Sequence, residues 1–238
     1  GEEKLSKMTR MINVLALGAS FGLIDYDKTY VEKAIKAIFG DKPKIISMNL
    51  LALGKAYDYA RRNFSDFGFK LEPGPTSEKR IFIQGTQAVA LGKLVGGCRL
   101  QTYYPITPAA DESEYLEENE VLELEKSAVE SAGGSIIVMQ TEDEIAAINM
   151  ASGAVLTGIR AATATSGPGF SLMVEGLGWA GNNEVPVVVT HYQRGAPSTG
   201  LPTRHGQSDL RFALHASHGE FPRIILCSGD IEECFYDA

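Results

Sequence analysis

Residues 161–190 read AATATSGPGFSLMVEGLGWAGNNEVPVVVT, and this stretch decides the predicted fold. Its first five residues form an uncharged run that favours a strand, and the glycines and proline of residues 166–169 then lead into a helix that continues to Trp179. Residues 185–190 are a second apolar run, of the kind found in strands that are buried in parallel sheets. A strand, a helix and a second strand in this order predict one unit of a parallel α/β sheet.

The same alternation extends over residues 81–238. Further strands are expected at residues 80–84, 99–104, 135–139 and 224–227. Further helices are expected at residues 85–97, 112–125 and 142–157, and a short helix capped by Ser228 or Asp230 is expected near residue 238. We therefore predict an α/β fold with a doubly wound, mostly parallel sheet for residues 81–238.

The N-terminal part is predicted to be part of a smaller α/β domain, over residues 1–67. Periodicity predicts strands at residues 13–19 and 44–48 and helices at residues 27–39 and 50–64. Asp27 is the expected N-cap of the first of these helices. Residues 68–80 are polar and contain prolines and a glycine, so we expect a linker there.

Composition and charge exclude several classes of protein. The 238 residues are 44% hydrophobic, and 22 basic and 30 acidic side chains give a net charge of −8. This charge disfavours nucleic acid as a partner, and no apolar run reaches the ~20 residues that cross a membrane. The first residues do not resemble a secretory signal. The three cysteines form no disulfide or metal-binding pattern, so we expect reduced thiols in a cytoplasmic protein.

Acidic and histidine residues are unevenly distributed along the chain. Residues 111–144 hold 12 acidic side chains and a single basic one, Lys126. We interpret this run as a solvated helix face. The four histidines lack the spacing of metal ligands, so we predict surface or hydrogen-bonding roles for them and no metal site on this chain.

Three loops that follow predicted strands carry most of the reactive side chains. Ligands bind at the carboxyl ends of the strands in such sheets. In YPITP, residues 104–108, two prolines hold Thr107 in a rigid loop, which is either an anion site or a simple turn. Arg194 follows a strand, where a guanidinium can receive a carboxylate or phosphate. The backbone N–H groups of the SGPG loop at 166–169 can contact an anion or a ring of a ligand. The alternative is that this loop is only a tight turn between a strand and a helix.

Glu144 differs from the two acids that precede it. All three lie at a helix start, where the helix dipole favours negative charge. Glu144 heads the sequence EIAAINMASGA, whose apolar and small residues indicate burial against the sheet. A carboxylate at the edge of such a face is a candidate for proton transfer.

The ordered set of motifs resembles the α subunit of the 2-oxoacid:ferredoxin oxidoreductases, in the archaeal type with a γ domain fused in front of α. The residues that carry the resemblance are YPITP at 104–108, Glu144 with Gly153 and Ala154, TSGPG at 165–169 with Glu175, and QRGAPSTGLPT at 193–203. The resemblance covers residues 81–238 strongly and residues 1–70 more weakly, as the last part of the γ domain. The start of the γ domain and the later α-subunit domains are not found, so we expect this chain to be a fragment.

The resemblance implies that residues 81–238 are the pyrimidine-binding domain of a thiamine diphosphate enzyme. Glu144 is then the catalytic residue that bonds the N1′ atom of the aminopyrimidine. The implied cofactor-binding residues are Glu144, Ser166 and Gly167, and the implied residues that hold the substrate carboxylate are Thr107, Arg194 and Thr203.

The implied reaction is oxidative decarboxylation of a 2-oxoacid with coenzyme A, which yields acyl-CoA, CO2 and reduced ferredoxin. The sequence has neither the G-D-G motif that binds Mg²⁺ with the diphosphate nor a four-cysteine cluster set. The resemblance therefore implies a partner β subunit that carries Mg²⁺, the diphosphate site and the [4Fe–4S] cluster, without which this chain is inactive. The preferred 2-oxoacid is not indicated, because Thr107 and Arg194 address the carboxylate that all 2-oxoacids share.

Two other interpretations stay open. One is a different thiamine diphosphate enzyme, transketolase-like or acetolactate-synthase-like, because TSGPG occurs there in similar form. The combination of YPITP with Gln193, Arg194 and Gly195 argues against it. The other is a non-catalytic nucleotide-binding or assembly module, which tight nucleotide binding by the isolated chain would favour.

Overall fold

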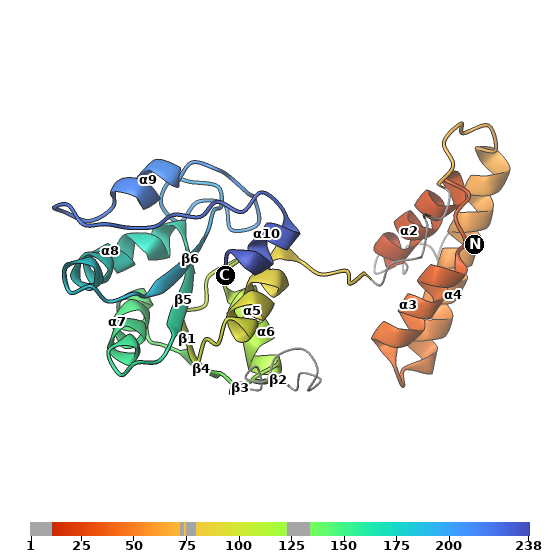
Figure 1. The fold of residues 1–238 in the computed structure, drawn as a ribbon. Helices are drawn as coiled ribbons and strands as arrows, with labels where there is room; N and C mark the ends of the chain where they lie inside the picture. Colours follow the sequence, from red (N-terminus) through yellow and green to blue (C-terminus); the bar gives the residue numbers. More distant parts are fainter. Residues whose placement is uncertain (1–10, 72–73, 75–79, 123–133) are drawn as a thin grey trace. The chain divides into compact units, whose positions relative to one another are not determined.

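The computed structural model of the chain describes residues 11–71, 74, 80–122 and 134–238 (Figure 1). The chain divides into two units, residues 1–80 and residues 81–238. None of the described helices is both long and apolar enough to span a membrane.

The first unit is built from helices. They are α2 (Ile12–Leu23), α3 (Thr29–Phe39) and α4 (Pro43–Asn63). The predicted helices at 27–39 and 50–64 are confirmed. The predicted N-cap is wrong by one residue, because Lys28 occupies that position, although the Asp27 carboxylate accepts a hydrogen bond from the backbone N–H of Thr29 (2.9 Å). The strands predicted at 13–19 and 44–48 are wrong, because these residues lie in α2 and α4. The described residues 11–71 therefore contain helices and no strand.

Close packing explains why the apolar run 13–19 is helical. Gly18 and Gly22 are four residues apart and so lie on one face of α2, where both are buried against α4. A Cβ atom on Gly18 would lie 3.1 Å from the Ala56 Cβ and closer still to the Leu53 carbonyl oxygen. An apolar run of this length does not distinguish a strand from a buried helix, and the contact between the two helices decides the matter.

Four parallel strands form the sheet of the second unit, in the order β4-β1-β5-β6. They are β1 (Leu100–Tyr103), β4 (Ile137–Gln140), β5 (Ala161–Ser166) and β6 (Val188–Tyr192). A small antiparallel pair, β2 (Val121–Leu122) and β3 (Gly134–Ser135), stands apart from it. The predicted α/β fold with a mostly parallel sheet is confirmed.

Helices cover both faces of this sheet (Figure 1). One face carries α5 (Gly85–Val95), α6 (Ala110–Glu118) and α10 (Ile231–Tyr236), and the other carries α7 (Glu144–Val155) and α8 (Gly167–Asn182), while α9 (Leu210–His215) follows β6. Alternation along β1 directs neighbouring side chains to opposite faces. Gln101 bonds to Glu112 of α6, whereas the Thr102 hydroxyl donates to the Ala147 carbonyl of α7 (2.8 Å).

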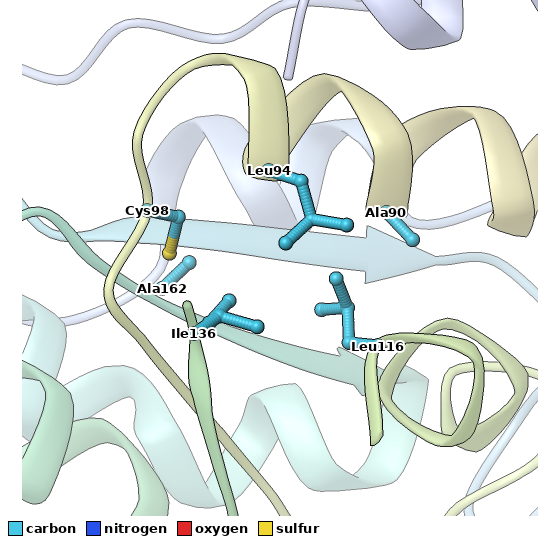
Figure 2. Packing of buried hydrophobic residues seen from close by; sticks show 6 residues of the cluster. All are labelled: Ala90, Leu94, Cys98, Leu116, Ile136 and Ala162. Carbon is cyan, nitrogen blue, oxygen red and sulfur yellow. The ribbon is translucent and has the colours of Figure 1, made fainter. Parts of the chain in front are cut away.

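A hydrophobic core lies between the sheet and the α5–α6 face (Figure 2). Its buried members are Ala90, Leu94, Cys98, Leu116, Ile136 and Ala162. On the opposite face, Ala147, Ile148 and Met173 form a second cluster between α7 and α8. Gly176 of α8 lies directly against Ile148, so the two helices pack closely there.

Several predicted boundaries differ from the structure. Residues 80–84 are not a strand, because the Gln84 backbone N–H bonds to the Gln87 side chain (2.9 Å) at the start of α5. Residues 224–227 are not a strand either, and Ile224 is 91% exposed. The acidic helix ends at Glu118, and residues 123–125 of the prediction lie outside the described residues. The second apolar run forms β6 at the edge of the sheet rather than a fully buried strand.

The α2–α4 contact predicts a difference between two glycine substitutions. Gly18→Ala should lower the free energy of unfolding by ~1–3 kcal/mol, because the added Cβ overpacks the helix contact. Gly54→Ala, in α4, meets nothing within 4 Å and should leave stability unchanged or raise it by up to ~1 kcal/mol. Urea denaturation of the two variants measures this, and equal midpoints would contradict the packing of α2 on α4.

Candidate functional site

Strand order brings two of the predicted loops to one point at the carboxyl edge of the sheet. After β1 the chain moves towards β4, and after β5 it moves towards β6, although β1 and β5 are neighbours. The loops that leave these strands therefore diverge, and such a switch point is where doubly wound sheets bind ligands. The loops are residues 104–109 after β1 and the start of α8 at Gly167 after β5.

Glu144 is the first residue of α7, immediately after the loop that follows β4. The Asp143 carboxylate caps the helix by accepting a hydrogen bond from the Ala146 N–H (2.7 Å). Glu144 itself is only 5% exposed. Burial raises the pKa of its carboxyl group above the ordinary value of 4.5, and the neighbouring Asp143 charge acts in the same direction. The carboxyl group therefore holds its proton to higher pH than an exposed glutamate does.

The Glu144 carboxyl group lies against Gly169 in the first turn of α8. A Cβ atom on residue 169 would collide with Glu144 Oε1 and with the Thr165 hydroxyl oxygen. Glycine at this position is therefore what allows a carboxyl group from the end of β4 to reach the end of β5. This contact joins two motifs that the sequence had identified separately.

Ser166 and Gly167 complete this part of the site. Ser166 is fully buried, and its hydroxyl has no hydrogen-bond partner within the described part of the chain. Gly167 faces Asp209, whose Oδ2 would lie 3.2 Å from a Cβ at this position. An unpaired buried hydroxyl costs free energy in the ligand-free protein, so a bound polar group that bonds to it would be favoured.

Arg194 and Thr107, which lie 87 residues apart, are brought together. The Arg194 side chain is 5% exposed, and its Nη1 donates to the Thr107 carbonyl (2.7 Å) while its Nη2 donates to the Thr199 carbonyl (2.7 Å). Thr107 and Thr203 are exposed. No hydrogen bond joins Glu144 to any of these residues in the described ranges, so the predicted cofactor and substrate residues form two separate groups.

The loop that carries Arg194 and Thr203 is closed on itself. The Gly195 N–H donates to the Arg204 carbonyl (2.7 Å), and the Leu201 N–H donates to the Gly195 carbonyl (2.8 Å). Gly200 has a φ of +65°, and a Cβ there would collide with the Gly195 carbonyl oxygen. The glycines of this motif are therefore required by the shape of the loop.

His191 and Asp209 form a pair that the sequence did not reveal. The His191 ring stacks on Phe170 of α8 (4.6 Å between ring centroids), and its Nε2 lies 3.5 Å from Asp209 Oδ2. Burial lowers the pKa of His191, although the Asp209 charge opposes the shift. The available signal in the sequence was that His191 directly follows the apolar run 185–190, and the structure places it at the strand ends, in register with Thr165 of β5.

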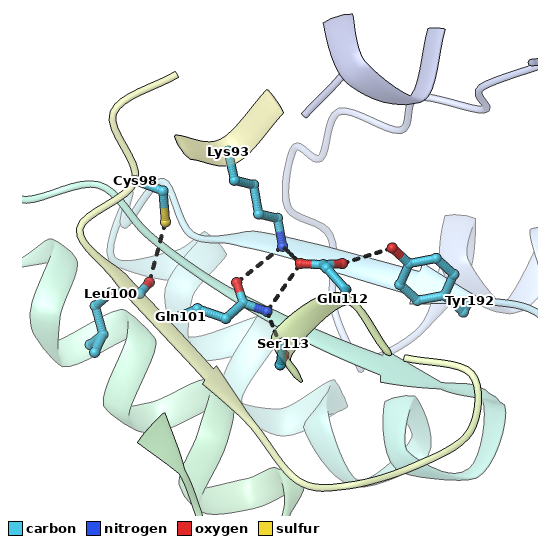
Figure 3. Close-up of polar contacts among 7 residues, drawn as sticks. All are labelled: Lys93, Cys98, Leu100, Gln101, Glu112, Ser113 and Tyr192. Atoms are coloured by element: carbon cyan, nitrogen blue, oxygen red, sulfur yellow. Dashed lines mark hydrogen bonds and ion pairs between the residues drawn. The ribbon is translucent and has the colours of Figure 1, made fainter. Parts of the chain in front are cut away.

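A buried polar network crosses the opposite face of the sheet (Figure 3). Lys93 of α5 forms an ion pair with Glu112 of α6, and Gln101 of β1 bonds to both of them (3.1 Å each). The Tyr192 hydroxyl at the end of β6 donates to Glu112 Oε2 (2.8 Å), and burial next to this carboxylate raises the tyrosine pKa. We call these residues, with Ser113, which also bonds to Gln101, the buried polar network.

The network corrects one interpretation of the sequence. The acidic run was predicted to be a solvated face, and Asp111 and Glu114 are indeed exposed. Glu112 is fully buried and was missed. Glu112 lies four residues before Leu116 and so on the same side of α6, which could have indicated burial. The prediction rested on charge composition alone and did not use this spacing.

The described residues contain no cluster of three or more histidine, cysteine, aspartate or glutamate side chains that could hold a metal ion. The polar groups of the site are instead a buried carboxyl group, hydroxyls, backbone amides and one guanidinium.

A parallel sheet with a buried carboxyl group beside a glycine-lined helix start defines an α/β ligand-binding domain with its site at the strand ends. Comparison with protein families identifies which one. Residues 92–238 match the family of the pyruvate flavodoxin/ferredoxin oxidoreductases, thiamine diphosphate-binding domain, and residues 2–59 match a pyruvate ferredoxin/flavodoxin oxidoreductase domain. The chain belongs to this oxidoreductase family.

Curated relatives carry consistent names. The chain is 53% identical over 230 residues to subunit alpha of 2-oxoacid:ferredoxin oxidoreductase 1 from Aeropyrum pernix, which covers 96% of this chain and 35% of that protein. It is 46% identical over 157 residues to the 2-oxoglutarate synthase subunit KorA from Methanothermobacter thermautotrophicus, covering 66% of this chain and 39% of that protein. The chain thus spans about a third of the length of the curated relatives it matches.

A solved structure has the same fold. It is a 2-oxoglutarate:ferredoxin oxidoreductase from Magnetococcus marinus with 2-oxoglutarate, coenzyme A and succinyl-CoA bound. The match has a TM-score of 0.77 at 37% identity and covers 95% of this chain and 38% of that one.

The raised pKa of Glu144 predicts a pH-dependent effect on stability. The native state binds the proton more tightly than the unfolded state, so the wild-type protein loses stability as pH rises from about 4.5 through the higher native pKa. Glu144→Gln removes this loss and should raise the melting temperature at pH 7 but not at pH 4. Thermal unfolding across this range tests it, with the exposed Glu142→Gln as control; equal effects at both pH values would refute the burial argument.

Proposed function

We propose that this chain is the part of a 2-oxoacid:ferredoxin oxidoreductase α subunit that binds the aminopyrimidine side of thiamine diphosphate. The observation that carries the proposal is the buried Glu144 carboxyl group held against Gly169 at the sheet's switch point. The activity of the whole enzyme is oxidative decarboxylation of a 2-oxoacid with coenzyme A, with ferredoxin as electron acceptor. The relatives named above, which share a third or more of the residues aligned, support this assignment.

The residues present fit the proposed cofactor. A heteroaromatic ring with a basic nitrogen needs a partly desolvated carboxyl group, and Glu144 supplies one. The Ser166 hydroxyl and the Asp209 carboxylate oxygen Oδ2 beside Gly167, neither of which has a hydrogen-bond partner in the described part of the chain, suit polar atoms on the same ring. When bound, thiamine diphosphate supplies the electron sink for the charge left on the carbonyl carbon as CO2 departs.

Glu144 then acts as a general acid–base group. Its raised pKa keeps a fraction of the carboxyl group protonated nearer to neutral pH, where it can donate a proton from a carboxyl oxygen to the ring nitrogen and take it back. Asp143 fixes the start of α7 and so the direction of the Glu144 side chain. Burial excludes water that would otherwise compete for this hydrogen bond.

The second group of residues binds the substrate carboxylate. Arginine has five N–H donors, and the two backbone carbonyls occupy one donor on each terminal nitrogen of Arg194. Among the remaining donors, the buried Nε–H has no hydrogen-bond partner in the described part of the chain, and a carboxylate held there would also meet the exposed hydroxyls of Thr107 and Thr203. Holding the guanidinium in a fixed plane prepares it for this contact before the substrate arrives.

The remaining parts of the proposal concern the whole enzyme. Residues 1–67 correspond to the last part of a γ-like domain, residues 68–80 to a linker and residues 81–238 to the pyrimidine-binding domain. A partner β subunit supplies the diphosphate site, Mg²⁺ and the [4Fe–4S] cluster, as the family resemblance implies. The assembled enzyme works in the cytoplasm with ferredoxin, and its preferred 2-oxoacid is not assigned.

Glu144→Gln tests the central assignment in the full-length chain assembled with its partner subunit. Turnover of 2-oxoacid should fall by a factor of ~10² to 10⁴, because glutamine cannot transfer the proton. Assembly should persist, since the amide has the shape of the carboxyl group. Ferredoxin reduction with pyruvate and 2-oxoglutarate is the measurement, and Glu142→Gln is the control. Turnover at the wild-type level would overturn the role of Glu144.

Arg194→Lys tests the substrate group. A lysine ammonium cannot hold two carbonyls and a carboxylate in one plane, so kcat/KM for the 2-oxoacid should fall by more than ~10-fold. Thr107→Val should weaken binding of the same substrate carboxylate. The effects of the two substitutions on kcat/KM should not add, because both residues act on one group. Steady-state kinetics of both single variants and the double variant decide this; strict additivity would reject the shared role.

A further inference from the structure

Two loops that carry the proposed substrate residues come from opposite ends of the second unit's sequence. Thr107 lies in the loop between β1 and α6, and Arg194 lies in the loop after β6. β1 and β6 are not neighbours in the sheet, because β5 lies between them. No backbone ladder joins β1 directly to β6, and the ladders of both strands with β5 end at Tyr103 and Tyr192, before the two loops begin.

One long-range hydrogen bond joins these loops directly, and a second joins the elements that flank them, β6 and α6. One is the hydrogen bond from Arg194 to the Thr107 carbonyl, at 2.7 Å. The other is the hydrogen bond from the Tyr192 hydroxyl to Glu112 Oε2, at 2.8 Å, two residues before Arg194 and five residues after Thr107 (Figure 3). The second contact stands outside the substrate group, so it can influence that group only through position.

The Glu112 end of this contact is held by the rest of the buried polar network. Its other oxygen, Oε1, pairs with Lys93, which is 2% exposed, and accepts a hydrogen bond from Gln101 at 3.1 Å. The Lys93 ammonium compensates the charge of the Glu112 carboxylate, whose second oxygen, Oε2, accepts the hydrogen bond from Tyr192. Lys93 in α5 and Gln101 in β1 thus hold Glu112 rigidly in place.

We propose that the Lys93–Glu112–Tyr192 chain sets the position of the loop of residues 193–204 relative to the loop of residues 104–109, and so aligns Arg194 with Thr107 for the 2-oxoacid carboxylate. Tyr192 and Glu112 are positioning residues, because they act through Arg194 and Thr107. This inference rests on the proposed function for its substrate, but the tie between the loops is a property of the fold. A carboxylate that is gripped by two loops needs both at a fixed separation.

Tyr192→Phe is the variant that tests the tie, in the full-length chain assembled with its partner subunit. It removes one hydroxyl and keeps the ring, so packing is preserved. Amide hydrogen exchange at Gly195, Leu201 and Arg204, whose N–H groups close the loop, should become faster. KM for the 2-oxoacid should rise ~10-fold with little change in kcat, because a displaced loop weakens alignment of the carboxylate.

Tyr103→Phe is the matched control. The Tyr103 hydroxyl also donates to a carboxylate of α6, Glu117 Oε1, at 2.9 Å, but this bond joins β1 to α6 and does not reach the loop after β6. The control should lose stability as Tyr192→Phe does and leave both the loop exchange and KM at wild-type values. Glu112→Asp keeps the negative charge but moves the carboxylate oxygen away from the Tyr192 hydroxyl. It should therefore show the same faster loop exchange and higher KM as Tyr192→Phe.

The outcomes separate the two proposals. Faster loop exchange and higher KM in Tyr192→Phe but not in Tyr103→Phe support the positioning role. Unchanged exchange in Tyr192→Phe, or equal changes in both tyrosine variants, overturn it. If the wild-type assembly turns over no 2-oxoacid, the proposed function fails, while the exchange comparison still decides whether the buried chain holds the loop.

Discussion

A buried ion pair between Lys93 and Glu112 determines how one helical face meets the sheet. Both side chains are at most 2% exposed, and Gln101 of β1 bonds to both. Removing one partner of such a pair costs ~3–5 kcal/mol, because the other charge stays buried without compensation. Any packing of α5 and α6 that separates the two charges is therefore strongly disfavoured. The pair therefore favours one arrangement of the helices. The hydrogen bond from the Tyr192 hydroxyl to Glu112 also ties the end of β6 to this arrangement.

The candidate cofactor residues occupy the other face, and the alternation of strand side chains explains this division. Neighbouring residues of β6 point in opposite directions, so Tyr192 joins the buried polar network while His191 stacks on Phe170 of α8. Thr165 of β5, in register with His191, lies beside Gly169 and Glu144. One face of the sheet thus provides rigidity, and the other provides a desolvated carboxyl group with a raised pKa. The two faces meet at the strand ends, where the loops with Thr107 and Arg194 emerge.

Prediction from the sequence succeeded where local pattern and tertiary context agree. The helices at 27–39 and 142–157 and the strand at 161–165 follow from periodicity and from their bounding residues, and the structure contains all three with shifted ends. It failed at residues 13–19, where Gly18, together with Gly22 one turn further along α2, serves helix packing rather than a turn after a strand. It also failed at Glu112, because a charge in an acidic run gives no sign of the lysine that lies opposite it in space.

The sequence by itself determined the α/β class of the second unit, the chemical identity of the candidate site and the family, because periodicity and the spacing of motifs are local properties. The tertiary structure alone decided the strand order, and with it the meeting of Glu144 with Gly169 and of Arg194 with Thr107. It also decided that Arg194 is bound to the backbone carbonyls of Thr107 and Thr199. The physical reason is that contacts between residues 25 to 87 positions apart depend on how the whole chain buries its apolar surface and compensates its buried charges, which no short segment encodes.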